Sequence, residues 1–309
     1  MDEKKTGLVV KAAGSLYTVQ DATSGALHVC KIRGKLRLRD TRTTNPLTVG
    51  DIVRYEAGST PVVTELIPRR NYIIRRAANL SKEAHIVAAN IDQAFLIATV
   101  DLPRTSWEFI DRFLASAEAY KIPVCIVIAK TDLYDGERLQ EAAHLEATYS
   151  AIGYRVLRTS IKEADSVNAV RPLLADKITL FSGNSGVGKS SLINALNPQL
   201  GLRVGEISDY HNKGRHTTAF SEMFEVAQNS YVVDTPGVKG FGLVDIEPRE
   251  LSHFFTEIFA ASGACRFTSC THVHEPECAV RKAVEQGKIS QNRYVSYLKM
   301  LEGNEKYRR

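Results

Sequence analysis

Two hydrophobic patterns divide the 309-residue chain. Between residues 7 and 68, five short apolar or alternating runs are separated by glycine-containing turns, a pattern typical of short β-strands. The runs are 8–10, 16–19, 26–32, 52–55 and 61–67. Five such strands predict a small barrel like the oligonucleotide-binding fold.

From residue 92 onward, continuous apolar runs alternate with helical patterns. Residues 92–100, 123–129 and 154–160 predict buried strands, whereas 106–120 and 137–152 carry apolar residues at helical spacing. Alternation of this kind predicts an α/β domain with a mostly parallel sheet that is covered by helices on both faces. Sheets of this class bind ligands beyond the carboxyl ends of their strands.

A phosphate-binding motif follows another strand pattern. Gly183, Gly188, Lys189 and Ser190 fit G-x-x-x-x-G-K-[ST], and a helix pattern comes next. In such a loop, backbone N–H groups and the lysine bind phosphates, and the serine hydroxyl can ligate Mg²⁺. The candidate nucleotide-binding residues here are Gly183, Asn184, Ser185, Gly186, Val187, Gly188, Lys189, Ser190 and Ser191.

Polar residues also follow three other strands. Residues 129–132 read Ala-Lys-Thr-Asp, residues 159–162 read Thr-Ser-Ile-Lys, and Asp234 begins a D-x-x-G motif that ends at Gly237. An acidic residue at that strand end can hold the Mg²⁺ shell, and the Gly237 N–H can meet a γ-phosphate. Together with the phosphate loop, these residues predict one nucleotide site.

Three cysteines and a histidine cluster near the C-terminus. Cys265, Cys270, His272 and Cys278 supply three thiolates and one imidazole, with His274 as the competing imidazole. No apolar targeting stretch follows the N-terminal residues, so we expect a cytoplasmic protein whose thiols bind metal rather than form disulfides. The set predicts a closed, tetrahedral, structural Zn²⁺ site.

Basic residues are concentrated at both ends of the chain, whereas the middle is acidic. This asymmetry favours contact of the flanks with a polyanion, and nucleic acid is the commonest one. Lys31, Arg33, Lys35, Arg37 and Arg39 alternate with other residues, so a strand here would have one basic face. That face is either a phosphate-binding surface or the protection of an edge strand.

Residues 280–309 have helical spacing and many basic side chains. The segment is either a second RNA-facing surface or a frayed amphipathic tail. Its basic residues include Arg281, Lys282, Lys288, Arg293, Arg308 and Arg309.

The order of the motifs resembles that of a circularly permuted GTPase. Residues 129–132 and 159–162, which correspond to the base-recognition segments of GTPases, precede the phosphate loop instead of following it. With a basic barrel before this domain and a Cys/His cluster after it, the chain is similar to the RsgA (YjeQ) family of bacterial GTPases, which assist maturation of the small ribosomal subunit. The resemblance covers about residues 7 to 300. It is carried by residues 90–92, 110–112, 183–190, 214–218, 234–242 and 265–278.

The resemblance implies that the ligands are GTP or GDP with Mg²⁺. Asp132 would accept hydrogen bonds from guanine, Lys130 would pack along the base, and Ser160 would lie in the loop that faces the base oxygen. The implied Mg²⁺ groups are Ser190, Asp234 and either Thr217 or Thr218. His216 is a candidate for reaching the water at the γ-phosphate, or else an exposed loop histidine.

Two positions depart from common GTPase patterns. Ala129 stands where the base-recognition motif usually begins with Asn, which predicts weaker guanine affinity. Val238 follows D-x-x-G where many GTPases carry a water-orienting glutamine. An apolar side chain cannot orient water, so we expect slow hydrolysis until a partner completes the site.

These observations predict four segments: an RNA-binding barrel at 1–68, a linker at 69–80, a permuted GTPase domain at 81–244, and a zinc-binding region with a basic helical tail at 245–309. We expect a monomeric GTP hydrolase that binds rRNA, is stimulated by the small ribosomal subunit, and contacts no membrane. The alternatives are an RNA-binding module in which the nucleotide is mainly structural, and an ATP-using assembly factor.

Overall fold

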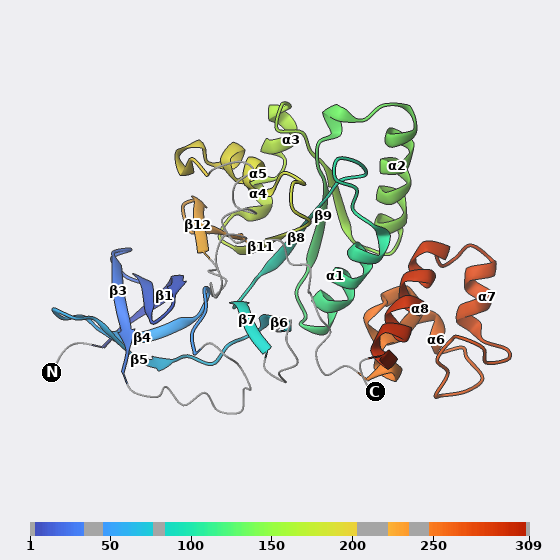
Figure 1. Ribbon diagram of the computed structural model, residues 1–309, viewed down its shortest axis with the longest axis horizontal. Helices are drawn as coiled ribbons and strands as arrows, with labels where there is room; N and C mark the ends of the chain where they lie inside the picture. The colour runs from blue at the N-terminus through green and yellow to red at the C-terminus, as the bar shows by residue number, and fades with distance from the viewer. Residues whose placement is uncertain (1–3, 34–45, 77–83, 203–221, 235–246, 307–309) are drawn as a thin grey trace.

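The computed structural model describes residues 4–33, 46–76, 84–202, 222–234 and 247–306 (Figure 1). Several residues discussed above lie outside these ranges. They are Lys35, Arg37, Arg39, His216, Thr217, Thr218, Gly237, Val238, Arg308 and Arg309. Within the described ranges, no helix has the length and apolar character needed to cross a bilayer.

The N-terminal region forms the predicted five-stranded barrel. Its strands are β1 (Lys4–Ala13), β2 (Leu16–Asp21), β3 (Leu27–Ile32), β4 (Ile52–Glu56) and β5 (Val62–Leu66). The strands pair in the order β1-β2-β3-β5-β4, and β4 pairs back to β1, which closes the barrel. Alternate side chains point inward, so Val9, Val19, Val53 and Tyr55 share one buried cluster.

The basic run in the barrel is only partly described. Strand β3 ends at Ile32, and Arg33 just beyond it lies 2.9 Å from a carboxylate oxygen of Glu56. Residues 27–30 of β3 pair with β2, whereas Lys31 and Ile32 pair with β5, so both alternatives for the basic run stay open. The longer basic face stays a prediction.

The segment that the sequence suggests as a linker contains a strand. Strand β6 (Tyr72–Arg76) pairs with β7 (Ala84–Ala89) in a separate two-stranded sheet. Just before β6, the Arg69 guanidinium forms a buried ion pair with Asp51 of the barrel, with 2.6 Å between Nε and Oδ1. Residues 69–76 are therefore anchored structure rather than a free connection, because Arg69 and Arg70 have acidic partners and the following residues form a strand. The domain boundaries themselves stay a prediction.

The central domain has the predicted parallel sheet. Its strands are β8 (Gln93–Ala98), β9 (Val124–Ile128), β10 (Arg155–Arg158), β11 (Ile178–Ser182), β12 (Glu222–Ala227) and β13 (Ser230–Asp234). They lie in the order β10-β9-β8-β11-β13-β12, and only β12 runs antiparallel to its neighbour. Glu222 of β12 pairs with Lys11 of β1, so this sheet continues into the barrel. Strand β12 was absent from the sequence-based expectation.

Helices cover both faces of the sheet (Figure 1). On one face, α1 (Trp107–Ala119) and α2 (Gly136–Ala151) pack against alternate residues of β8 and β9. On the other face, the short helices α3 (Ala164–Asn168) and α4 (Arg171–Leu174) pack with α5 (Lys189–Leu196). The 3₁₀ turns η1 (Thr131–Leu133) and η2 (Pro198–Leu200) follow β9 and α5. This two-faced burial explains the continuous apolar strands seen in the sequence.

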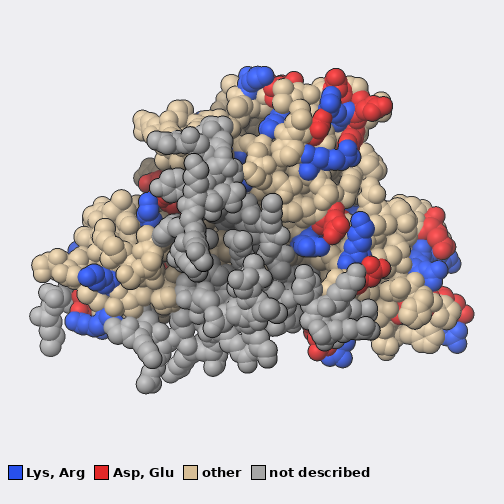
Figure 2. Space-filling view, viewed as in Figure 1, with Lys and Arg blue, Asp and Glu red and all other residues tan. Residues whose placement is uncertain are grey.

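The C-terminal region is helical and packs on α1. Its helices are η3 (Pro248–Phe254), α6 (Thr256–Ser262), α7 (Ala279–Glu285) and α8 (Gln291–Lys306). The residues from 280 onward, which have the predicted helical spacing, form α7 and α8 with Gly287, at a φ of +69°, between them. Charged side chains of both signs are mixed over α2 and over this region on the face in Figure 2.

One basic residue of this tail does not face solvent. Arg293 on α8 is 1% exposed and forms ion pairs with Asp111 of α1 and Glu257 of α6, at 2.8 and 2.7 Å. Tyr149 of α2 also donates a hydrogen bond to Asp111. The inclusion of Arg293 in a possible RNA-facing surface is therefore wrong, because its side chain is buried. A basic residue at helical spacing has the same sequence signature whether it faces solvent or a buried carboxylate.

Candidate nucleotide and metal sites

The phosphate loop connects β11 to α5. Gly183, Gly186 and Gly188 have φ values of +149°, +81° and +104°, a region that favours glycine. A Cβ at Gly183 would lie 2.3 Å from the Ile97 carbonyl oxygen, so the loop needs glycine there for space as well. The loop backbone is thus fixed by its contact with β8 and by the residues of the motif.

Lys189 is held over this loop. Its Nζ donates to the carbonyl oxygens of Gly183 and Asn184, at 2.9 and 3.0 Å. Burial lowers the pKa of Lys189, and the nearby Asp234 carboxylate opposes this shift. Asp234 ends β13, next to β11, and is buried. The structure therefore brings the phosphate-loop lysine and the predicted Mg²⁺-binding aspartate to one edge of the sheet.

The predicted base-recognition residues meet at the ends of β9 and β10. Ser160 is buried, and its hydroxyl donates to Asp132 Oδ1 at 2.7 Å. The Lys162 ammonium lies 2.9 Å from Asp132 Oδ2. Hydrogen bonds from Lys162 and then Ser160 lower the pKa of Asp132, so the carboxylate is ionised and available as an acceptor at neutral pH. Sequence reasoning placed residues 159–162 at this strand end but gave Lys162 no role, and its ion pair with Asp132 supplies one.

Lys130 links the base-recognition residues to the loop that follows β8, next to the phosphate loop. Its φ of +62° places it in the left-handed region, where it turns the chain away from β9. Its Nζ donates to the Leu102 carbonyl oxygen at 2.5 Å. A Cβ placed on Gly186 of the phosphate loop would lie 3.6 Å from Cδ of the adjoining Pro103. The loop after β8 therefore connects the base-recognition segment to the phosphate loop.

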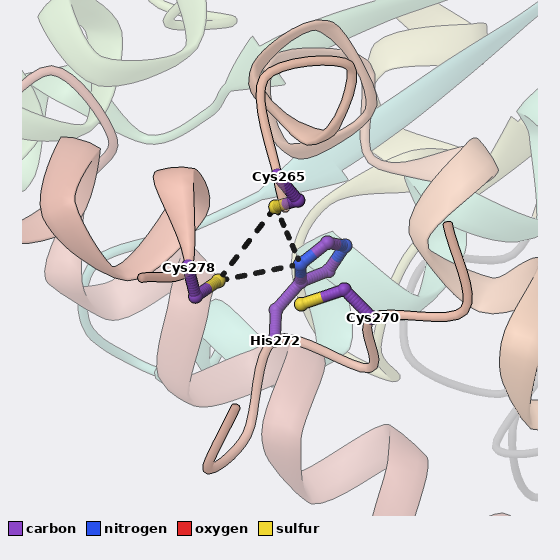
Figure 3. A group of neighbouring side chains, drawn as sticks. All are labelled: Cys265, Cys270, His272 and Cys278. Atoms are coloured by element: carbon purple, nitrogen blue, oxygen red, sulfur yellow. Dashed lines mark hydrogen bonds between the residues drawn. The ribbon is translucent and has the colours of Figure 1, made fainter. Parts of the chain in front are cut away.

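The cysteine cluster converges as predicted (Figure 3). Its ligand atoms come from Cys265, Cys270, His272 and Cys278, and all lie within 4.8 Å of one another. Sγ of Cys265 and Sγ of Cys278 are 3.9 Å apart, and His272 Nδ1 lies 3.6 and 3.5 Å from them. Tetrahedral Zn²⁺ with its usual bond lengths requires about 3.8 Å between two sulfurs and about 3.6 Å between sulfur and nitrogen. The donor set therefore fits Zn²⁺.

The geometry also separates the two candidate imidazoles. His272 is 2% exposed and faces the thiols, whereas His274 is exposed and lies outside the cluster. Burial lowers the pKa of His272, which favours the neutral imidazole that a metal requires. Burial also raises the pKa of the Cys270 thiol to about 12, and Cys278 and Cys265 add to this shift. Metal binding must therefore release the proton of the Cys270 thiol.

Three residues that sequence reasoning missed support this cluster. Glu275 accepts hydrogen bonds from the backbone N–H groups of Thr271 and Val273, at 2.6 and 3.0 Å. Tyr294 and Tyr297 of α8 donate to the carbonyl oxygens of His272 and Thr271, at 2.6 and 2.8 Å. Helix α8 thus supports the loop that carries the imidazole.

Comparison with known sequences identifies the family. The RsgA N-terminal domain matches residues 6–60, and the RsgA GTPase matches residues 66–244. The chain belongs to the RsgA GTPase family. The curated protein of Bacteroides fragilis named small ribosomal subunit biogenesis GTPase RsgA is 53% identical to it over 306 residues, which is 98% of both chains. The protein of that name from Flavobacterium johnsoniae is 45% identical over 309 residues, covering 98% of this chain and 95% of its own.

Solved structures of RsgA relatives have the same architecture. The crystal structure of YjeQ from Thermotoga maritima matches with a TM-score of 0.80 at 37% identity, covering 97% of this chain and 98% of that one. YloQ, described as a circularly permuted GTPase, matches with a TM-score of 0.75 at 32% identity, covering 99% and 96%. The permuted order that the sequence suggests is thereby confirmed.

Proposed function

We propose that this chain hydrolyses GTP and acts as a nucleotide-dependent switch in late maturation of the small ribosomal subunit. Its partners are the subunit and its rRNA, and it acts as a monomer in the cytoplasm. Hydrolysis, stimulated by the subunit, couples the nucleotide state to release from an assembly intermediate.

The supporting observation is the convergence of two residue sets at one sheet edge. Asp234 ends β13, and Lys189 begins α5, directly after the phosphate loop that follows β11. Lys130, Asp132 and Ser160 lie just beyond the ends of β9 and β10. These strands are parallel, so their carboxyl ends face the same side. A nucleotide there has its phosphates at the glycine loop and its base at Asp132.

Guanine selection rests on the ionised Asp132. A carboxylate accepts hydrogen bonds from the N1 and N2 groups of guanine, whereas adenine has an acceptor at N1 and no group at position 2. Ser160 orients this carboxylate through their hydrogen bond of 2.7 Å. Competition of GTP, ATP and XTP for the apo protein tests the assignment. Equal affinity for ATP and GTP would favour an ATP-using factor instead.

The Mg²⁺ site uses Ser190 and Asp234, completed by Thr217 or Thr218. Bound Mg²⁺ supplies a positive charge that neutralises the β- and γ-phosphate oxygens. Lys189 adds a second positive charge at the same phosphates, and the Gly237 N–H meets the γ-phosphate. Because Val238 cannot orient water, His216 or a group from the subunit performs that role.

The four ligands near the C-terminus hold a structural Zn²⁺. Since all four positions are protein side chains, no position stays open for a substrate or a water molecule. The region acts in RNA contact together with the basic barrel. Its contribution is to fix the shape of residues 265–278 rather than to perform chemistry.

The deciding experiment measures GTP hydrolysis with and without purified small ribosomal subunits. We expect slow basal hydrolysis and a clear rise with subunit concentration. Lys189→Ala should abolish both, because it removes the charge at the phosphates. No stimulation across a range of subunit concentrations would contradict the proposal. Normal maturation and subunit release in cells that carry Lys189→Ala would favour the RNA-binding module.

A further inference from the structure

We call the sheet edge that carries Lys130, Asp132 and Lys189 the nucleotide edge. The hydrogen-bond ladder between β8 and β9 stops there. The two strands are parallel, with Ala94 opposite Val124 and Ala98 opposite Ile128. Ala94 N donates to Pro123 O, and Ala129 N donates to Ala98 O. In a parallel ladder, bonds to the same neighbour recur every second residue. The next rung would therefore run from the Val100 N–H to the Ala129 carbonyl oxygen.

A tyrosine hydroxyl occupies the position of that rung. Tyr134 Oη accepts a hydrogen bond from Val100 N at 3.1 Å and donates one to Ala129 O at 2.6 Å. The residue is 8% exposed, so bulk water is a poor substitute for the hydroxyl. The phenol thus satisfies both backbone groups and keeps the two strand ends from pairing directly.

The rung after it is also redirected. Continued pairing would place Thr131 N on Val100 O, but Thr131 N donates to Thr159 O beyond β10 instead, at 3.2 Å. Lys130, in its left-handed conformation, makes this change of direction. The chain therefore leaves β8 and turns toward Ser160 at the residues proposed to recognise the base.

The end of β8 is held separately against the phosphate loop. Thr99 N donates to Thr105 Oγ1, and Thr105 N donates back to Thr99 O, at 3.0 and 2.8 Å. The turn so formed carries Leu102, whose carbonyl oxygen accepts a hydrogen bond from Lys130 Nζ, and Pro103, whose Cδ lies 3.6 Å from the place that a Cβ on Gly186 would take. A change of spacing between Val100 and Ala129 would therefore move the base-recognition residues relative to the phosphate loop.

We propose that the Tyr134 hydroxyl is a positioning group for guanine recognition. By replacing one rung of the ladder, it sets the separation of the β8 and β9 ends and hence the place of Lys130 and Asp132 relative to the phosphates. Ala129 has no side-chain donor or acceptor for this purpose, so the phenol provides the connection. The inference rests on the proposed nucleotide site and adds Tyr134 to the residues that determine its preference for guanine.

The test compares Tyr134→Phe with Tyr154→Phe. Both residues are nearly buried tyrosines that lose one hydroxyl, but Tyr154 donates to Glu118 at 3.0 Å, away from the phosphate loop. Loss of the Tyr134 hydroxyl should weaken GDP binding by about tenfold, the size expected when a buried bridging group is lost. KM for GTP should rise by a similar factor, with kcat within about twofold. The reason is that the variant weakens binding of the substrate and of the transition state equally. The affinity for Mg²⁺-tripolyphosphate should not change.

The outcomes separate this inference from the proposed function. Failure of the wild-type chain to bind guanine nucleotides would overturn both. Normal GDP affinity in Tyr134→Phe would overturn the positioning role alone, and so would an equal loss in Tyr154→Phe. A parallel loss of tripolyphosphate affinity would also count against it, since that probe has no base.

A measurement on the wild-type protein does not depend on how the variant folds. In the apo protein, the Val100 amide should exchange its hydrogen as slowly as the Ala129 amide, because the buried phenol bonds it. Exchange of Val100 at the rate of the Leu102 amide in the exposed turn would contradict the inserted rung.

Discussion

The nucleotide edge and the cysteine cluster each gather side chains suited to a ligand, but they are built differently. At the nucleotide edge, parallel strands and two buried apolar clusters fix the backbone, and Lys130, Asp132 and Lys189 extend from it. At the cluster, residues 264–278 contain no helix or strand, and their side chains themselves converge. The first site is therefore shaped by the sheet, whereas we expect the shape of the second to depend on a metal ion that joins its four donors.

Helix α8 contacts both the cysteine cluster and the GTPase core. Its tyrosines support the backbone around His272, whereas Arg293 on the same helix binds Asp111 of the GTPase core. The helix thus stays anchored to α1 by contacts that do not involve the metal. We expect metal loss to disorder the cluster and to leave the nucleotide edge intact.

The largest expected effect comes from removing a metal ligand. Cys278→Ala should lose zinc and unfold residues 264–278, at an apparent cost on the order of 10 kcal/mol for this segment. Zinc content and limited proteolysis would measure both effects. Cys30→Ala, which removes a buried thiol of the barrel, should keep its zinc. A zinc-free cluster that resists proteolysis like the wild type would show that residues 264–278 hold their shape without the metal.

Next in size is the buried ion pair. Arg293→Met should destabilise the protein by about 3–5 kcal/mol in urea unfolding, because it leaves the Asp111 carboxylate buried without its cation. Burial raises the pKa of Asp111, and Arg293 opposes that shift, so the variant raises it further. A raised folded-state pKa means that stability is retained at acidic pH and lost as pH rises.

The Arg293→Met penalty should therefore be small below about pH 4, the ordinary range for Asp, and should grow toward neutrality. A penalty that does not change with pH would show that Asp111 is not the group left uncompensated.

A smaller effect tests the backbone of the phosphate loop. Gly183→Ala introduces a Cβ 2.3 Å from Ile97 O at a φ of +149°, and should cost about 1–3 kcal/mol besides reducing GDP affinity. Gly263→Ala is the matched control, since a Cβ there meets nothing within 4 Å and the residue lacks a positive φ. Unchanged GDP binding in Gly183→Ala would mean that the sheet does not set the loop geometry.

The smallest effect is expected at the surface of the cluster. Arg266 and Glu277 form an ion pair at 3.2 Å, but both side chains are more than half exposed. Arg266→Ala should change stability by about 0–1 kcal/mol and leave the zinc content unchanged. A loss as large as that of Arg293→Met would show that this exposed pair holds the cluster together.

Much of the fold could be predicted because its signals are local. Periodicity predicts the five barrel strands and the buried strand in residues 123–129, and motif spacing predicts the phosphate loop. The four metal ligands also lie within a short segment. Strand β6 was missed because its flanking arginines resemble a solvated linker, and their acidic partners are distant in sequence.

The missed site residues have the same explanation. Nothing near Tyr134 in the sequence reveals that its hydroxyl replaces a rung between two other segments. Arg293 resembles the other basic residues of the tail, although its partner Asp111 is far away in the chain. Interactions of this kind depend on tertiary structure, which local patterns do not encode.

The most direct test of the central claim is the GDP affinity of the protein after its zinc has been removed by a chelator. If the sheet builds the nucleotide edge and the metal builds the cluster, GDP affinity should stay within about twofold of the zinc-bound value while residues 264–278 become protease-sensitive. A loss of GDP binding in step with the loss of zinc would contradict the account.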